Sequence, residues 1–279
     1  MDPGLNMSLL EVRMEYPKPG PVGGTLIRRV LALLDQFAAR PSVDSHILIA
    51  LSGGPDSVAL ARLLTRYGRK IAREGKIRLI HFNHGWPKPE TDDDAEWVQH
   101  LADIWGLPLD LGHGVPDLEN GDSLEAQART QRKAFYSEIL ARYPGSWVFT
   151  GHHADDLAET VLWRILSGAR EHSWGGIRVQ SAHDRELRPF LTTRKSELIE
   201  FLREEGLGWR EDAANRNPRF LRNRMRARLM PEVSALFPAA VETLAALALA
   251  RQHPNNLSSL PEAKTSERSR PSEGRFIDV

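Results

Sequence analysis

The chain has 279 residues, of which 41% are hydrophobic and 27% are charged. This balance is typical of a globular protein and excludes a wholly disordered chain. Lysine plus arginine and aspartate plus glutamate both number 37, so any attraction to a polyanion must come from local clusters of charge. The absence of cysteine excludes disulfides, thiolate zinc sites, iron–sulfur clusters and cysteine nucleophiles.

The most apolar stretch of the sequence is too short to cross a membrane. It covers residues 241–250 and contains Glu242, whereas a membrane-spanning helix needs about 18 apolar residues. The first 24 residues contain acidic residues and prolines where an export signal would have a basic start and an apolar block. We therefore expect a cytoplasmic protein with a flexible N-terminal tail over residues 1–24.

Helical and strand patterns then alternate. Apolar residues recur at helical spacing from Thr25 until Pro41, and the apolar run 46–51 predicts a buried strand. A turn with two glycines, residues 52–57, separates this strand from a second helical pattern that begins at Val58. The sequence thus predicts a strand, a tight turn and a helix.

The same unit repeats further along the chain. Residues 77–82 predict a second strand, after which Thr91 is expected to cap a helix whose first turn carries three aspartates. Residues 108–111 predict a third, weaker strand. Asp122 and Glu125 have the spacing of a capping box ahead of the next helix.

A fourth strand is predicted over residues 147–150, followed by a helix to about residue 167. This alternation favours an α/β fold with a mostly parallel sheet and helices on both faces. Ligands of such folds bind at the carboxyl ends of the strands.

The pattern changes after Gly168, where an irregular polar segment leads to Pro189. Helical patterns follow over residues 193–205, 219–230 and 233–251. We expect an α/β domain over residues 25–185, a small helical domain over 186–252 and a disordered tail over 253–279.

Charge is segregated along the sequence. Residues 90–125 include eleven acidic residues and no lysine or arginine, whereas residues 188–228 include eleven basic residues against six acidic ones. Six of these arginines lie between Arg216 and Arg228. Such a cluster is typical of phosphate-backbone binding, although ion pairs with the acidic segment are an alternative.

The turn Ser52-Gly53-Gly54-Pro55-Asp56-Ser57 carries the most specific chemistry. Two glycines let the backbone approach a ligand, and the following helix offers free amides and a positive dipole end, a combination that binds phosphate. The sequence has neither the Walker A motif nor the dinucleotide-binding pattern at this point. Because Asp56 would repel phosphate, it implies a Mg²⁺ ion between them. The alternative is a plain strand-to-helix turn.

This hexapeptide resembles the signature of the PP-loop, or N-type ATP pyrophosphatase, superfamily. Within it, further motifs resemble the tRNA(Ile)-lysidine synthase family. They are NHG at 83–85, EAQARTQR at 125–132, TGHHADDLAET at 150–160, RP at 188–189, WRED at 209–212 and RNRMR at 222–226. The departures are Trp86-Pro87-Lys88 after the first motif and the segment 168–177, which is usually glycine- and leucine-rich.

The resemblance implies a ligase that uses ATP to adenylate the wobble cytidine of tRNA(Ile) with a CAU anticodon. L-lysine then displaces AMP to form lysidine. The implied cofactors are ATP and Mg²⁺, and the implied partners are this tRNA and L-lysine, with no membrane. The oligomeric state is left open, with a homodimer as one option.

The site residues that we expect fall into four groups. ATP would be bound by Ser52, Gly53, Gly54, Pro55, Asp56, Ser57, Arg129 and His152. The catalytic group comprises Asp56, Asp156, Arg129 and Arg224, of which the two aspartates would hold the metal. The RNA would be bound by Arg132, Arg219, Arg222, Arg226 and Arg228.

Several alternatives stay open. One of the two histidines, His152 or His153, together with Asp155 could serve only to cap the next helix, and Arg129 with Arg132 could be a solvated helix face. Six tryptophans could stack on bases, but most are expected in the core. Another PP-loop ligase, acting on a small molecule or on a different tRNA base, and a non-catalytic RNA-binding module are the competing functions. A thiolase is disfavoured by the lack of cysteine.

Overall fold

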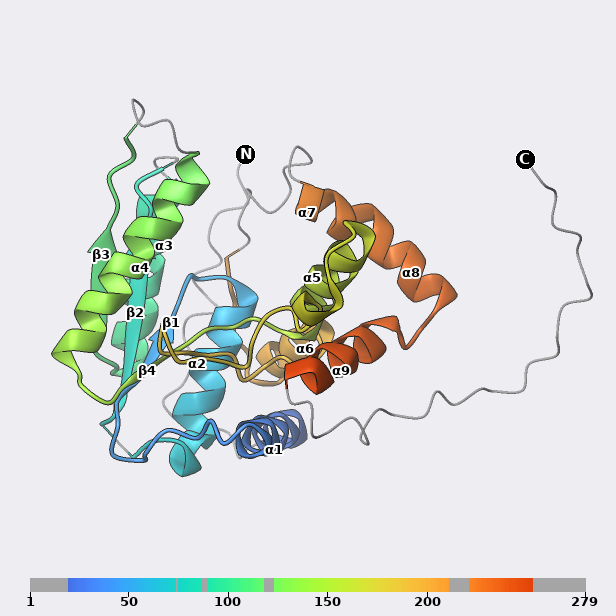
Figure 1. Ribbon diagram of the computed structural model, residues 1–279. Coiled ribbons are helices and arrows are strands. Elements are labelled where there is room, and N and C mark those ends of the chain that lie inside the picture. Colours follow the sequence, from blue (N-terminus) through green and yellow to red (C-terminus); the bar gives the residue numbers. More distant parts are fainter. Residues whose placement is uncertain (1–19, 74, 87–89, 118–122, 211–220, 253–279) are drawn as a thin grey trace, which may run out of the picture.

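The computed structural model describes residues 20–73, 75–86, 90–117, 123–210 and 221–252 (Figure 1). Its centre is a six-stranded sheet in the order β3-β2-β1-β4-β6-β5. The strands are β1 (Ile47–Ala50), β2 (Ile77–Asn83), β3 (Leu109–His113), β4 (Trp147–Phe149), β5 (Gln180–Ser181) and β6 (Glu186–Leu187).

All pairings in this sheet are parallel except the one between β5 and β6. The mostly parallel α/β fold predicted from the sequence is therefore confirmed. The strand β1 lies near the middle, paired with β2 on one side and β4 on the other. The loops that follow these three strands consequently meet at one edge, where the turn over residues 52–57 and the predicted residues His152 and Asp156 lie.

The helices are α1 (Pro21–Gln36), α2 (Pro55–Tyr67), α3 (Glu90–Trp105), α4 (Leu124–Arg142), α5 (Ala154–Leu166), α6 (Lys195–Glu204), α7 (Leu221–Arg224), α8 (Met230–Leu236) and α9 (Ala240–Gln252). Single 3₁₀ turns lie at η2 (Gly68–Lys70) and η3 (Glu171–Ser173). A π-helical segment, η5 (Met225–Leu229), joins α7 to α8.

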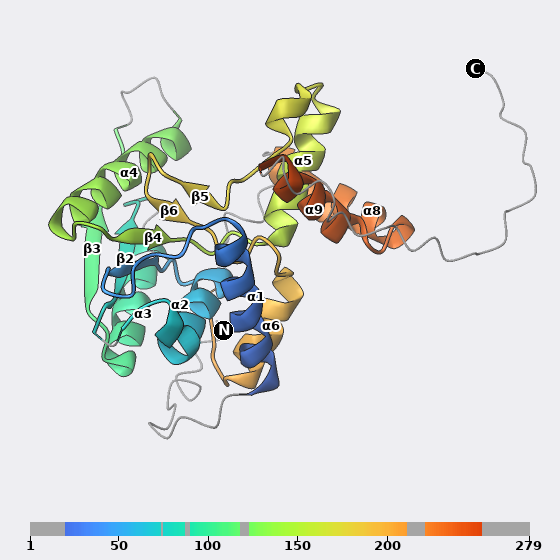
Figure 2. The ribbon, with the colours of Figure 1, turned by 60° about the horizontal axis from the view of Figure 1, so that its bottom comes forward.

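The two faces of the sheet are covered differently. The odd-numbered side chains of β1 pack against α1, α2, α3 and α6 in the largest apolar core, whereas Leu48 faces α4 together with Ile80 and Val148. A second core lies beside the sheet, where α5 packs against α9. Figure 2 shows α5, α8 and α9 grouped to one side of the sheet.

Several boundaries differ from those expected. The first helix begins at Pro21 rather than Thr25, because proline fits the first turn of a helix. Thr91 lies inside α3 and not at its cap. The cap of α4 is Ser123, whose side chain accepts a hydrogen bond from the Ala126 backbone, while Asp122 lies outside the described residues.

The strands β5 and β6 form a hairpin in the segment that the sequence presents as irregular. Two residues are too few for the alternation that marks a strand. The strand β6 continues the sheet beyond β4, so its residues 186 and 187, assigned by sequence to the helical domain, belong to the sheet. The division into two domains stays a prediction.

The helical patterns near the C-terminus also end elsewhere. A continuous helical segment runs from Leu221 through η5 to Leu236, and α9 starts at Ala240. Among the described residues no single helix is long and apolar enough to cross a membrane; residues 225–236 and 240–252 reach that length and apolarity only as a pair bent by 100°.

Candidate active site

The turn after β1 is built to leave backbone amides available. Gly54 occupies the cap position of α2 and provides no side chain to accept a hydrogen bond, and Pro55 follows at the first helical position. Gly53 has a φ of +90°, which favours glycine. The N-terminus of α2 therefore combines a positive dipole end with amides that no side chain caps, as phosphate binding requires.

Two serines hold the shape of this turn. The Ser57 hydroxyl donates to the Gly54 carbonyl at 2.9 Å and accepts from the Ser52 amide at 3.1 Å. The two hydroxyls also lie 3.1 Å apart. On the other side, the Gly53 carbonyl accepts a hydrogen bond from the Arg210 backbone at 2.9 Å. The turn is therefore fixed from within and by the chain after α6.

The end of β4 touches this turn directly. A Cβ atom added to Gly151 would lie 2.9 Å from the carbonyl carbon and oxygen of Asp56, so only glycine fits there. Next to it, His152 Nδ1 lies 3.0 Å from the Thr150 hydroxyl. The segment after β4, which carries His152, thus lies directly against the turn over residues 52–57.

Asp56 is held in a partly buried position without full compensation. Its Oδ1 atom is buried and forms no hydrogen bond with any described residue. Lys195 Nζ lies 3.6 Å from Oδ2, and His153 Nε2 lies 3.7 Å from Oδ1. Burial raises the pKa of Asp56 against the opposing charges of these two cations. A buried carboxylate oxygen without a hydrogen bond is suited to act as a ligand of a cation.

The histidine ring brings the two predicted metal ligands together. Nε2 of His153 lies 3.4 Å from Asp156 Oδ2 as well as 3.7 Å from Asp56 Oδ1. Within the described ranges, no group of three or more histidine or acidic side chains has the geometry to hold a metal ion by itself. Mg²⁺ commonly uses one or two carboxylates plus substrate phosphates, a donor set that these two aspartates fit.

His153 also begins α5. Its Nδ1 lies 3.4 Å from the Asp156 amide, and the Asp156 carboxylate accepts from the His153 amide, which completes a capping box. Asp155 does not cap this helix. Its carboxylate accepts from the Lys195 amide at 2.8 Å and from Arg194 Nε at 3.1 Å, so it anchors the start of α6.

Arg226 closes the acidic side of the site. Its guanidinium donates to Asp156 at 2.7 Å and to both oxygens of Glu159 at 2.8 and 2.9 Å. Burial acts to lower the pKa of Arg226, but these carboxylates raise it overall. The sequence predicts this arginine on the RNA, whereas here it lies on the carboxylates of α5. The wide turn of η5 positions it there.

Two other predicted arginines, Arg224 and Arg228, lie outside this cluster. Arg224 and Arg228 are exposed on either side of Arg226. Arg219 is outside the described residues, and the side chain of Arg222 is not described. Their roles stay predictions. Arg210, in the basic segment 188–228, forms an ion pair with Asp94 in the acidic segment 90–125. This contact fits the alternative to RNA binding, in which the basic residues pair with the acidic segment.

Arg129 and Arg132 lie in the N-terminal half of α4, which starts at the carboxyl edge of the sheet. Arg129 is exposed and Arg132 is half-buried. Burial, and then the positive charge of Arg129, act to lower the pKa of Arg188 on the segment after β6, so these two cations face the same region. The pKa of Tyr136 is raised to about 12 by burial, although Arg132 acts to lower it.

Sequence reasoning missed Lys195. It lies in the first turn of α6, after the last strand of the sheet, and its ammonium lies 3.6 Å from Asp56 Oδ2. The signal available was its position, since a lysine that opens the helix after a strand points to the carboxyl edge. Of the tryptophans, Trp97, Trp105 and Trp209 pack against the core, whereas Trp86 and Trp163 are exposed.

Comparison with known proteins gives consistent results. The model of the PP-loop domain family matches residues 25–233. A tRNA(Ile)-lysidine synthase from Azoarcus sp. (strain BH72) is 36% identical over 212 residues, which is 75% of this chain and 46% of that protein. The same enzyme from Solibacter usitatus is 38% identical over 202 residues, 72% of this chain and 44% of that protein. The chain spans about half the length of the curated relatives it matches.

Among solved structures, the U34-tRNA thiolase NcsA from Methanococcus maripaludis, with its [4Fe-4S] cluster, is similar in fold. The TM-score is 0.64 at 15% identity, over 83% of this chain and 79% of that chain. This likeness concerns the fold alone. The present sequence has no cysteine and hence no thiolate that could hold such a cluster.

Proposed function

Because the chain belongs to the PP-loop family, we propose that it is an ATP-dependent ligase that modifies the wobble cytidine of tRNA(Ile) with a CAU anticodon. ATP adenylates the C2 oxygen of that base and pyrophosphate leaves. The ε-amine of L-lysine then displaces AMP, and lysidine results. The name of the curated relatives supports this reaction, and the cytoplasm is the proposed location.

The turn over residues 52–57 would bind the β- and γ-phosphates. The uncapped amides at the start of α2 support this role, as does the close approach of Gly151. Arg129, exposed at the carboxyl edge, would contact the phosphates through its planar fork of donors. His152 would line the nucleotide beside the turn. With its phosphate tail held, ATP would expose the α-phosphorus to the attacking oxygen.

Asp56 and Asp156 would hold Mg²⁺ on the nucleotide. When bound, the ion supplies charge neutralisation for the phosphate oxygens. His153 orients both carboxylates, since its ring lies within 3.7 Å of each. The ammonium of Lys195 lies nearest to the other carboxylate oxygen of Asp56, Oδ2, and balances the negative charge of this side chain. These residues would thus hold the two carboxylates in place for one Mg²⁺ ion. The proposed reaction needs no covalent protein intermediate.

The arginine cluster would bind the RNA. The surface of α7 and η5 joins the acidic start of α5 through Arg226, so RNA bound here lies next to the turn. Arg224, exposed and adjacent, is proposed to reach the reacting phosphate. In this arrangement residues 25–185 bind ATP and residues 186–252 bind tRNA. The proposed RNA contacts are Arg132, Arg219, Arg222, Arg226 and Arg228.

One observation carries the proposal. Two carboxylates from the first turns of α2 and α5 meet at one histidine beside a helix N-terminus that no side chain caps. A turn that served only to reverse the chain would not need a buried carboxylate oxygen without a hydrogen bond, because such a group is costly.

The test is pyrophosphate release with each component omitted in turn. We expect release to require Mg²⁺ and an RNA with a CAU anticodon, and AMP release to require lysine as well. Asp56→Asn should reduce turnover at least about a hundredfold while RNA affinity stays within about twofold. Asp44→Asn, which changes an exposed carboxylate, is the matched control.

Other outcomes identify the competing functions. Turnover without RNA would favour a ligase for a small molecule, and turnover with a different tRNA would favour modification of another base. RNA binding with no turnover under any condition would favour a non-catalytic module. Equal loss of turnover and RNA affinity in Asp56→Asn would contradict the role given to that residue.

A further inference from the structure

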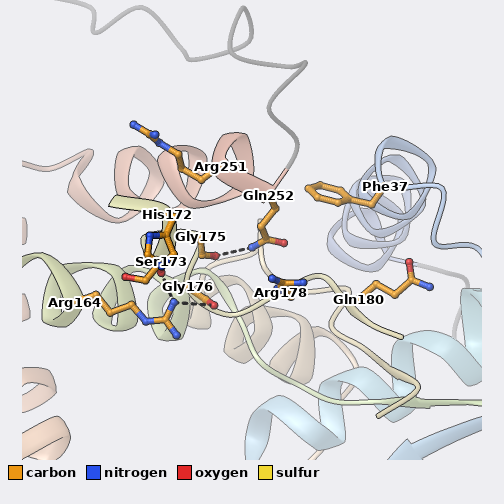
Figure 3. Close-up of a pocket in the computed structure, with 10 residues that line it drawn as sticks. All are labelled: Phe37, Arg164, His172, Ser173, Gly175, Gly176, Arg178, Gln180, Arg251 and Gln252. Atoms are coloured by element: carbon orange, nitrogen blue, oxygen red, sulfur yellow. Dashed lines mark hydrogen bonds between the residues drawn. The ribbon is translucent and has the colours of Figure 1, made fainter. Parts of the chain in front are cut away.

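A cavity of about 460 Å³ lies at the far end of α5 from the glycine turn. Arg164, which lines it, is eight residues beyond Asp156 on the same helix, a distance of about 12 Å at the helical rise. The last residues of α9 and the cap of α1 complete the wall (Figure 3). The volume lies within the range of small-ligand pockets, about 300–1,000 Å³.

The wall of this cavity is held in a fixed shape. The Gln252 amide nitrogen donates to the carbonyls of Gly175 and Ile177 at 2.7 and 2.8 Å, and its oxygen accepts from the Val179 amide at 3.0 Å. Arg164 donates to the carbonyls of Ser173 and Gly176 (Figure 3). These bonds tie the loop between η3 and β5 to two helices, so a ligand would meet a preorganised surface.

The cavity carries an excess of positive charge. Arg251 forms an ion pair with Glu171, and Arg164 is used on backbone carbonyls. Arg178 is exposed, and none of the ion pairs found among the described residues involves it. His172 adds an imidazole to the same wall. The guanidinium of Arg178 is therefore available to an anion.

A second cavity, between β3 and α4, differs from the first in its charge. Its charged side chains are paired within the protein. Asp110 pairs there with Arg78 at 3.0 Å and with Arg142 at 2.9 Å. Of these two cavities of the described residues, the one at the end of α5 has the excess of positive charge.

We propose that the cavity at the end of α5 is a subsite for one nucleotide of single-stranded RNA. This inference rests on the proposed function and deepens it. Arg178 takes the phosphodiester, and the Gln180 amide, on the same wall, hydrogen-bonds the edge of the base. The half-buried Phe37 ring forms the opposite wall (Figure 3). Sites for single-stranded nucleic acid combine such cationic and aromatic groups.

The position of the cavity supports RNA rather than an unrelated anion. The helix α5 starts at the proposed reaction site and ends at the cavity, so one RNA strand can reach both. The segment 168–177, which contributes His172, Ser173, Gly175 and Gly176 to the wall, departs from the usual glycine- and leucine-rich pattern. The subsite is accordingly a property of this chain's own residues.

The experiment measures binding of a fluorescently labelled single-stranded RNA, with the sequence of the anticodon loop, to the full chain. Arg178→Ala should weaken binding about tenfold, as expected for a charge-assisted contact. It should also reduce the slope of log affinity against log salt by about 0.7. Arg69→Ala, an exposed arginine in η2, is the matched control and should change affinity less than about twofold.

Two results would overturn the subsite. One is RNA affinity in Arg178→Ala equal to that of the wild type. The other is that inorganic phosphate binds in an Arg178-dependent way while the RNA does not compete, which would mark a site for small anions. ATP titration of the same samples separates this inference from the proposed function. Normal ATP binding with unchanged RNA binding in Arg178→Ala removes the subsite alone, whereas absent ATP binding in the wild type removes the proposed function.

Discussion

His153 connects three carboxylates and one helix start. Its Nδ1 atom lies 3.4 Å from Asp155 Oδ2 and also 3.4 Å from the Asp156 amide. The imidazolium donates to the carboxylate, whereas the neutral ring accepts from the amide, so the two bonds belong to different protonation states. Burial acts to lower the pKa of His153, but Asp155, Asp156 and Asp56 together raise it above its usual value. The charged ring is thereby favoured.

This shift predicts a dependence of stability on pH. A raised pKa means that the folded chain binds the proton more tightly than the unfolded chain does. The resulting stability is complete below the unfolded pKa of about 6.5 and is lost as pH rises through the folded pKa. We expect the Tm of the wild type to fall as pH rises above about 6.5, and this fall to be smaller in His153→Asn, which keeps a capping side chain.

The matched control for replacing an imidazole is His100→Asn, at an exposed position of α3. Thermal unfolding followed by circular dichroism across the pH range makes the comparison. A parallel loss of Tm in the wild type and both variants would show that His153 is not the group responsible.

Asp155 responds in the opposite direction. Although burial acts to raise its pKa, the His153 ring and the Lys195 amide hold the pKa well below its usual range. The stability that Asp155 provides is therefore present above the unfolded pKa of about 3.9 and is lost as pH falls below it. Acid should accordingly release the start of α6 from α5.

At the scale of elements, the approach of β4 to the turn after β1 can be tested at Gly151. A Cβ at this position would lie 2.9 Å from backbone atoms of Asp56, and backbone cannot rotate away as a side chain can. We expect Gly151→Ala to displace the turn, to cost about 1–3 kcal/mol of stability and to weaken ATP binding at least about tenfold.

Gly208→Ala is the control for this substitution, since no atom lies within 4 Å of its added Cβ. Its effect on the free energy of unfolding should stay within about 0.5 kcal/mol. Denaturant titration and ATP titration of both variants make the comparison. Equal ATP affinities in the two variants would show that the end of β4 does not shape the nucleotide site.

The contact between η5 and α5 depends on Arg226. Its removal takes away the guanidinium that donates to Glu159, which is 4% exposed, and to Asp156. Breaking a fully buried ion pair costs about 3–5 kcal/mol, but the Arg226 side chain is 35% exposed, so we expect a smaller effect. Arg226→Ala should lower the free energy of unfolding by about 2 kcal/mol. Urea unfolding measures this change.

Arg228→Ala, two residues further along, changes an exposed arginine and should cost less than about 0.5 kcal/mol. Adding Glu159→Gln to Arg226→Ala should recover part of the loss, because it removes one of the two negative charges with which Arg226 pairs. A loss in Arg226→Ala no larger than that in Arg228→Ala would mean that the contact does not hold η5 against α5.

At the scale of the whole molecule, the sequence predicts the parallel sheet and the glycine turn well. Both are local: apolar runs mark the buried strands, and the turn residues are consecutive. The strands β5 and β6 were missed because two residues carry no periodicity. Their place in the sheet depends on pairing with β4, which is distant in sequence.

The site was only partly predictable for the same reason. Arg226 meets partners 67 and 70 residues earlier in the chain, and nothing in a dense arginine cluster tells which member turns inward. Lys195 reaches Asp56 from the helix after the sheet, so its role appears only once the chain is folded. Local motifs identify the residues of a site, whereas their partners depend on contacts between distant segments.

The central claim is that the turn after β1 holds the phosphate tail of ATP. Calorimetric titration of the full chain with ATP and with AMP, both in the presence of Mg²⁺, tests it most directly. We expect saturable binding of ATP. Binding of AMP should be at least about tenfold weaker, because AMP lacks the β- and γ-phosphates that the turn would bind. No binding of ATP, or equal binding of ATP and AMP, would contradict it.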